Sequence, residues 1–120
     1  MYLYFVFFLK KILDNFLHNS IMKKINKDII CSAIKSKQLI QFIFNNCERI
    51  VEPYCYGTSK NNKEVLRAYQ IKGKSTSGKP IGWKLFDVSK IDNIKINKKL
   101  FAIGHHYGAE PTIKTKYCCI

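Results

Sequence analysis

Polar and apolar residues alternate along three stretches in the middle of the chain, at 39–44, 64–71 and 83–88. Successive side chains of a β-strand point to opposite faces, so this alternation predicts strands with one face buried and the other exposed. Polar, turn-forming residues separate the stretches, and two further strands are expected at 47–52 and 93–97.

Helical spacing replaces the alternation just before these strands. Three apolar residues stand at positions i, i+3 and i+4 and form one stripe: Ile30, Ala33 and Ile34. This stripe predicts a helix over about 28–37, with Asn26 or Asp28 as its N-cap.

The order of these elements indicates a mainly β fold. One short α-helix followed by five short strands is typical of a small closed or half-open barrel, because closure removes the exposed edges of a sheet. Asn45 and Asn46 are expected to form the first hairpin turn, and Pro53, which has no N–H to donate, is expected at an edge or a bulge. The length of 120 residues allows one domain, with the barrel over 22–97 and residues 98–120 as a tail or a final strand.

The N-terminal extension, residues 1–21, has a different character. Residues 2–9 form an unbroken apolar run, far shorter than the roughly 20 residues that span a bilayer, and the lysines follow it, which is the wrong side for a signal peptide. The extension can be an amphipathic helix that lies on a membrane or on a partner. Alternatively it is an upstream extension of a chain whose natural start is Met22. Under both interpretations we expect it to stay outside the barrel core.

Charge limits the range of partners. The 21 basic residues exceed the 8 acidic residues by 13, which favours a polyanion such as nucleic acid or an acidic membrane surface. Lysine that merely solvates the surface is the alternative explanation. Only two of the basic residues are arginines, Arg49 and Arg67. The planar guanidinium group donates hydrogen bonds in fixed directions, so these two are better candidates for specific contacts.

The five cysteines favour a cytoplasmic protein with reduced thiols. Their number is odd, no CxxC pair occurs, and the adjacent pair Cys118-Cys119 is an awkward basis for a disulfide framework.

Catalytic and metal chemistry have no support in the sequence. Residues 73–79 have the spacing of a phosphate-binding P-loop, but Pro80 replaces the hydroxyl residue that would bind Mg²⁺, and a strand follows where a helix is needed. His105-His106 and the adjacent cysteine pair point their side chains apart, which disfavours a zinc site. No nucleophile stands beside a base. We therefore expect no enzyme activity, no metal and no cofactor.

Arg67 and Tyr69 are the strongest candidates for a binding site. They stand two apart on one predicted strand and therefore point the same way. An arginine beside an aromatic ring can hold a phosphate through two hydrogen bonds while a base stacks on the ring. Alternatively, Tyr69 packs in the core and Arg67 covers the mouth of the barrel.

The segments around these residues resemble the WYL domain, a small SH3/Sm-like β-barrel found mostly in bacterial transcription regulators. The resemblance covers roughly residues 27–96. It rests on Val-Glu-Pro at 51–53, on the Leu-x-x-Tyr strand at 66–69 and on the aromatic strand at 82–86. Glu-Val-Leu at 64–66 replaces the Trp-Tyr-Leu triplet that names the family. The chain would therefore be a divergent, single-domain member.

The resemblance implies a pocket of basic and aromatic residues that binds an anionic ligand. The positions that match this pocket are Arg67, Tyr69, Lys84 and Tyr54. Three lysines at the end of the same strand and in the next loop are expected to contact nucleic-acid phosphates: Lys72, Lys74 and Lys79. Asp87 stands where the family often has arginine, which weakens the positive field of the pocket.

The implied function is regulatory. The domain would bind a nucleotide or single-stranded nucleic acid and act in transcriptional or related regulation. WYL proteins usually carry a helix-turn-helix domain before the barrel, and the stretch before residue 27 leaves no room for one, so a separate DNA-binding regulator is an expected partner. The alternatives are an Sm-like homo-oligomer that binds RNA non-specifically and a peripheral, membrane-associated basic protein.

Overall fold

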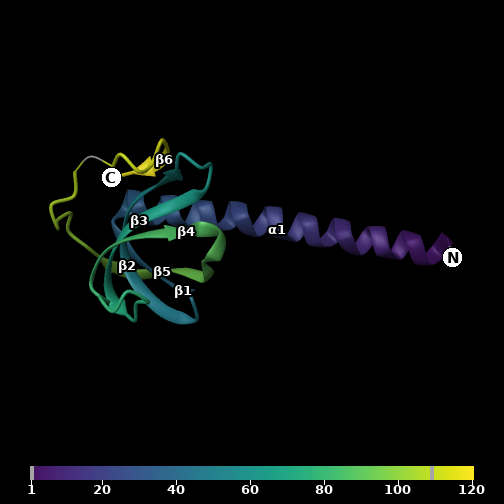
Figure 1. Ribbon diagram of the computed structural model, residues 1–120, viewed down its shortest axis with the longest axis horizontal. Helices are drawn as coiled ribbons and strands as arrows, with labels where there is room; N and C mark the ends of the chain where they lie inside the picture. Colours follow the sequence, from purple (N-terminus) through teal and green to yellow (C-terminus); the bar gives the residue numbers. More distant parts are fainter. Residues whose placement is uncertain (1, 109) are drawn as a thin grey trace.

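The computed structural model describes residues 2–108 and 110–120, which form one long helix and one antiparallel sheet (Figure 1). The helix α1 covers Tyr2–Ser36. The strands are β1 (Gln38–Phe44), β2 (Cys47–Thr58), β3 (Glu64–Gly73), β4 (Gly82–Asp87), β5 (Asp92–Leu100) and β6 (Thr115–Cys119). A short 3-10 helix, η1 (Val88–Lys90), connects β4 to β5. The expected mainly β fold is confirmed, and β6 lies within residues 98–120, where a tail or a final strand was expected.

The two edge strands of the sheet follow one another closely in the sequence. The strand order is β4-β3-β2-β1-β5, and β6 pairs with β2 beside this path. β4 and β5 are therefore the two ends of the order, yet only four residues, those of η1 and Ile91, lie between them. β2 is long enough to pair with β1 near its start and with β3 and β6 further along.

Local sequence explains three details of the sheet. Asn45 and Asn46 have φ angles of 50° and 60°. Asparagine tolerates this conformation, which suits the tight turn of a hairpin, so the predicted turn is confirmed. The register of β2 on β3 shifts between Pro53 and Cys55, which places the proline at a bulge as expected. Position 57 requires glycine, because a Cβ there would collide with backbone atoms of β6.

The core lies between the sheet and the last turns of α1. The predicted stripe of Ile30, Ala33 and Ile34 is buried. It packs with inward-facing side chains of four strands, including Ile40, Phe42, Val51, Leu66 and Phe86. The ring of Phe86 meets the ring of Phe42 edge-on, with centroids 5.0 Å apart. The C-terminal end of the helix is therefore anchored on the sheet.

The predicted start of the helix is wrong. α1 begins at Tyr2 and runs through Asn26 and Asp28, which therefore cap nothing. The chain has no glycine or proline before Pro53, so no residue in this stretch breaks the helix. Figure 1 shows the N-terminal half of α1 extending away from the sheet. Residues 3–25 are all exposed, which leaves the described part of the N-terminal extension outside the core, while Met1 lies outside the described residues.

Two disulfides fasten β6 to the rest of the molecule. Cys118 pairs with Cys31 of α1, and Cys119 pairs with Cys55 of β2. The expectation of reduced thiols is therefore wrong for four cysteines, and Cys47 alone is free. Adjacent residues of a strand point to opposite faces, so the neighbours Cys118 and Cys119 reach two different partners.

Candidate functional site

Arg67 and Tyr69 lie on β3 and share one face of the sheet. In the pairing with β4, Arg67 stands opposite Leu85 and Tyr69 stands opposite Trp83. The side chains of Arg67 and Tyr69 are both partly buried. The predicted pair is therefore assembled on one face, but a later segment of the chain covers both residues.

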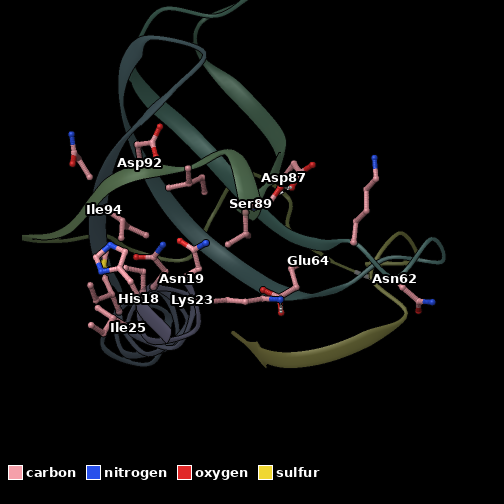
Figure 2. Close-up of a pocket in the computed structure, with 17 residues that line it drawn as sticks. His18, Asn19, Lys23, Ile25, Asn62, Glu64, Asp87, Ser89, Asp92 and Ile94 are labelled. Atoms are coloured by element: carbon pink, nitrogen blue, oxygen red, sulfur yellow. Dashed lines mark hydrogen bonds and ion pairs between the residues drawn. The ribbon is translucent and has the colours of Figure 1, made fainter. Parts of the chain in front are cut away.

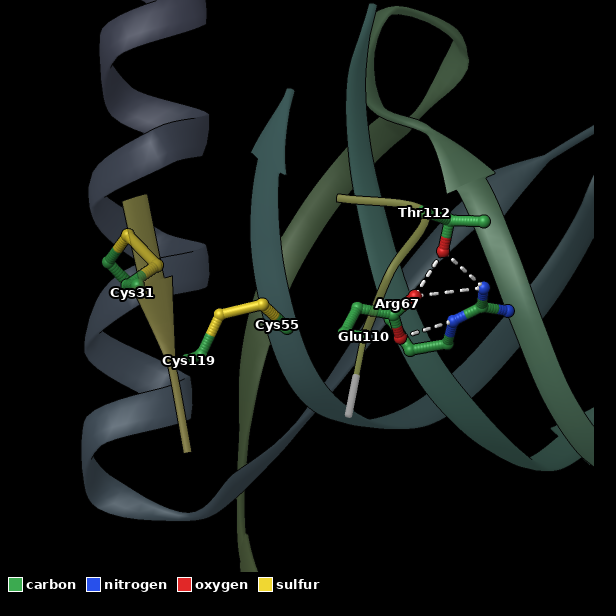
Figure 3. The surroundings of a disulfide bond; sticks show 7 residues. Cys31, Cys55, Arg67, Glu110, Thr112 and Cys119 are labelled. Atoms are coloured by element: carbon green, nitrogen blue, oxygen red, sulfur yellow. Dashed lines mark hydrogen bonds and ion pairs between the residues drawn. A yellow bond between two sulfur atoms is a disulfide. The ribbon is translucent and has the colours of Figure 1, made fainter. Parts of the chain in front are cut away.

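The guanidinium group of Arg67 holds the carboxylate of Glu110 (Figure 3). Arg67 Nε donates to one carboxylate oxygen at 2.8 Å, and Nη2 donates to the other at 3.2 Å and to Thr112 Oγ1 at 2.9 Å. Burial alone would raise the pKa of Glu110. The hydrogen bonds from Arg67 and Thr112 outweigh burial and hold that pKa below its ordinary value. Arg67 thus binds the carboxylate through two hydrogen bonds, which is the geometry in which arginine side chains also bind phosphate.

Tyr69 belongs to a cluster of six rings, which we call the aromatic cluster. Its members are Tyr54, Tyr69, Trp83, Phe101, His105 and Tyr107. The imidazole ring of His105 lies flat on the Tyr69 ring, with centroids 3.5 Å apart and an interplanar angle of 5°. Trp83 Nε1 donates to the backbone oxygen of His105 at 3.1 Å. A planar heterocycle therefore occupies the stacking position that was predicted for a base.

Glu110 and His105 belong to what we call the covering segment, residues 104–108 and 110–112. Neither residue was predicted to belong to the site. One signal for Glu110 was present, because it is the only acidic residue after Asp92 and stands in a basic stretch. An isolated carboxylate among lysines needs an opposite charge when it is buried, and Glu110 is only 8% exposed.

Tyr54 is fully buried, and its ring packs against the rings of Trp83 and Tyr107 in the aromatic cluster. Its hydroxyl donates to Glu52 Oε1 at 3.0 Å and accepts from the backbone N–H of Gly104 at 3.2 Å. Desolvation, reinforced by Glu52, raises the pKa of Tyr54 to about 12, so this hydroxyl stays protonated. Tyr54 was predicted to contact the ligand, but its position instead anchors the start of the covering segment.

Lys84 does not extend the patch formed by Arg67, which corrects the prediction. It stands opposite Ala68 in the β3–β4 register and therefore points to the other face. Its ammonium group donates to Ser75 Oγ at 3.0 Å, to Ser77 Oγ at 3.3 Å and to the backbone oxygen of Lys79 at 2.5 Å. An ammonium group has three protons, and all of them are used. Lys84 thus fastens the loop between β3 and β4.

The remaining predicted lysines, Lys72, Lys74 and Lys79, are exposed at the end of β3 and in the following loop. Their positions suit weak, long-range attraction of phosphates. The second arginine, Arg49, is only 3% exposed and is a core residue. Its guanidinium lies over the ring of Phe44 at 5.1 Å, and Nε donates to the backbone oxygen of Phe44 at 3.3 Å.

Asp87 caps η1. Its carboxylate accepts from the backbone N–H of Ser89 at 3.0 Å and from the Ser89 hydroxyl at 2.6 Å. These hydrogen bonds, the side-chain bond first, lower the pKa of Asp87. Asp87 therefore has a local structural role at the end of β4.

A groove and a smaller hollow are among the hollows that adjoin the sheet. A groove of about 930 Å³ lies between α1 and the region around η1 and β5 (Figure 2). The ion pair of Lys23 with Glu64, at 3.7 Å, links the helix side of this groove to β3. A smaller hollow of about 270 Å³ is lined by Arg67, Trp83, Tyr107 and Glu110, among others. Arg67 and its partner Glu110 both line the smaller hollow.

Within the described residues, 2–108 and 110–120, no helix is long and apolar enough to cross a membrane. Within the same residues, no group of three or more His, Cys, Asp or Glu side chains is placed to hold a metal ion.

Comparison with known proteins found no significant similarity to a family model, to a curated protein or to a solved structure. The resemblance to the WYL domain therefore rests on the residues quoted from the sequence, and it enters the functional argument as a hypothesis.

Proposed function

We propose that the chain is a WYL-like regulatory module of the SH3/Sm-barrel type that binds an anionic ligand at Arg67 and Tyr69. The ligand class is a nucleotide or single-stranded nucleic acid. One observation carries the proposal: Arg67 holds a carboxylate through both of its oxygens while an imidazole ring stacks on Tyr69. The fork that fits a carboxylate also fits a phosphate, and a ring that stacks on imidazole also stacks on a base.

The barrel is part of this proposal. Its support is the connection of the two edge strands, β4 and β5, through only four residues, those of η1 and Ile91. A short connection between the two ends of a sheet favours closure, and closure would protect both edges from pairing with other chains.

In this proposal the covering segment acts as an internal competitor. Glu110 takes the position of a phosphate, and His105 takes the position of a base. Ligand binding then requires the covering segment to leave the sheet, so the apparent affinity is reduced by the fraction of molecules that are open. Ligand binding would release the covering segment, and a separate DNA-binding regulator would recognise the released segment.

The test is binding of a labelled single-stranded oligonucleotide, followed by fluorescence anisotropy over a series of salt concentrations. Glu110→Gln removes the internal carboxylate and should strengthen binding. Glu48→Gln is the matched control, because it changes the net charge equally at an exposed position of β2. Arg67→Lys keeps the charge but loses the fork, so it should weaken binding roughly tenfold, since charge-assisted hydrogen bonds contribute about 1.5–3 kcal/mol.

The lysines should behave differently from Arg67. Lys74→Ala or Lys79→Ala should weaken binding modestly and reduce the salt slope by about one unit each. If Glu110→Gln and Glu48→Gln bind equally while Arg67→Lys binds like wild type, the site is not at Arg67. Binding would then be the general attraction of a basic surface for a polyanion. A ring-sized species on a sizing column, formed with RNA, would support the Sm-like oligomer instead.

Cytoplasmic localisation, expected from the cysteine count, stays a prediction. The two disulfides provide its test, because proteins of the cytoplasm rarely keep such bonds. Thiol alkylation at the moment of cell lysis should modify all five cysteines in a reducing compartment and Cys47 alone in an oxidising one.

A further inference from the structure

The N-terminal part of α1 presents an uninterrupted apolar surface to solvent. From Leu3 to Leu9 every side chain is aliphatic or aromatic, and each is exposed, from 44% for Leu9 to 84% for Tyr4. Contiguous exposed apolar surface of this kind marks an interaction site in a soluble domain. Figure 1 shows that this end of α1 points away from the sheet, so the sheet does not obstruct access to it.

The distribution of these side chains around the helix distinguishes between partners. Seven consecutive residues cover almost two turns, so the apolar surface at 3–9 surrounds the helix. A second helix in a coiled coil covers only one stripe and would leave the other sides in water. Lipid acyl chains can contact the helix on all sides at once.

The charges next to this tip also favour lipid. Lys10 and Lys11 follow the apolar residues directly, and no acidic residue precedes Asp14. Beyond the lysines the helix becomes one-sided, with apolar Ile12, Leu13, Phe16 and Leu17 on one flank. Basic residues beside an apolar helix are typical of segments that bind anionic membrane surfaces.

We propose that residues 3–9 of α1 insert into one leaflet of an anionic membrane. Seven helical residues are roughly 10 Å long, which is less than half of the roughly 30 Å hydrocarbon core of a bilayer. Lys10 and Lys11 then lie at the level of the lipid phosphates, and the one-sided stretch that follows rests in the interface. The folded sheet stays outside the bilayer at the other end of a molecule 61 Å long.

The apolar tip of α1 is separate from the anion site on β3. Arg67 and Tyr69 lie on the sheet, whereas the inserted residues lie at the far end of α1 (Figure 1). Loss of either activity in a variant therefore does not imply loss of the other.

The experiment is co-sedimentation of the full chain with phosphatidylcholine vesicles that contain or lack phosphatidylserine. We expect binding to the anionic vesicles and a loss of at least tenfold in the bound-to-free ratio for Phe7→Asp/Phe8→Asp, because burial of each Phe side chain contributes strongly to partitioning. Ile81→Asp is the matched control, since Ile81 is 53% exposed in the β3–β4 loop and should not contact lipid. Lys10→Gln/Lys11→Gln should remove most of the preference for phosphatidylserine.

Insertion depth gives a second measurement. Phe7→Trp should gain a blue-shifted emission that lipids brominated in the acyl chain quench, while the native Trp83, which lies on β4, should remain unquenched. Equal sedimentation of Phe7→Asp/Phe8→Asp and Ile81→Asp would overturn the proposal. Analytical ultracentrifugation gives a further test. A dimer that persists unchanged when vesicles are added would also overturn the proposal, and the apolar tip would then bind a second copy of the chain.

Discussion

The carboxyl group of Glu110 is the charged contact of the covering segment with Arg67 of the sheet. The pKa of this group is lowered in the folded protein, chiefly because the hydrogen bonds from Arg67 outweigh burial. The contribution of the ion pair to stability is therefore fully present above the ordinary glutamate pKa of about 4.3 and is lost as the pH falls through the lowered folded-state value.

We therefore predict that acid releases the covering segment before the sheet unfolds. Trp83 reports the release, because its Nε1 donates to the backbone of His105 and it is the only tryptophan of the chain. Its emission should shift to the red on acidification while the far-ultraviolet circular dichroism stays constant. Glu110→Gln should show the shifted emission already at neutral pH. An identical pH profile for wild type and Glu110→Gln would contradict this role of Glu110.

At the scale of the elements, β6 depends on covalent bonds to two other elements. We predict that a tryptic digest without reductant contains one species of three linked peptides, residues 28–35, 50–60 and 117–120. These peptides carry Cys31, Cys55 and the Cys118-Cys119 pair, respectively. The peptide with Cys47 should run alone. Three separate peptides in a digest protected from disulfide exchange would contradict the pairing.

The free energy of unfolding should also depend on the two disulfides. The disulfides join residues 87 and 64 positions apart, and in the chain-entropy account closure of loops of this size contributes up to about 4 kcal/mol each. Reduction should therefore lower the free energy of unfolding measured with denaturant. Cys47→Ser is the control, and we expect no change because this thiol is free.

The helix α1 divides into an anchored part and a projecting part. We predict that a chain starting at Met22 melts within a few degrees of the full chain, because the residues removed are exposed, whereas Ile30, Ala33 and Ile34 keep their buried positions. Differential scanning calorimetry measures the comparison. A much lower melting temperature for the shortened chain would mean that residues 1–21 are part of the folded core.

At the scale of the whole molecule, the features that could be predicted from the sequence are those that depend on residues close to one another in the chain. Alternation located the strands, and the stripe at Ile30 located the packed part of the helix. The hairpin turn at Asn45 and the bulge at Pro53 followed from the conformations that these residues favour. Each of these features depends on neighbours within a few residues.

Features that depend on distant contacts were not predicted. Cys118 meets a residue 87 positions away, and Arg67 meets Glu110 across 43 positions. Local pattern carries no information about such pairs. The thiols were therefore predicted to be reduced, and Arg67 was predicted to be available for a ligand. Lys84 was assigned to the wrong face because the register between β3 and β4, which sets its direction, cannot be read from either strand alone.

The adjacent cysteines of β6 also set an order of events during synthesis. Both covalent closures need residues 118 and 119, so neither bond can form until those residues have left the ribosome. α1 emerges first, and its apolar tip is available long before the sheet that will fold behind it. The order of synthesis therefore favours contact of the tip with its partner before the sheet folds, and it allows covalent closure only after β6 has been made.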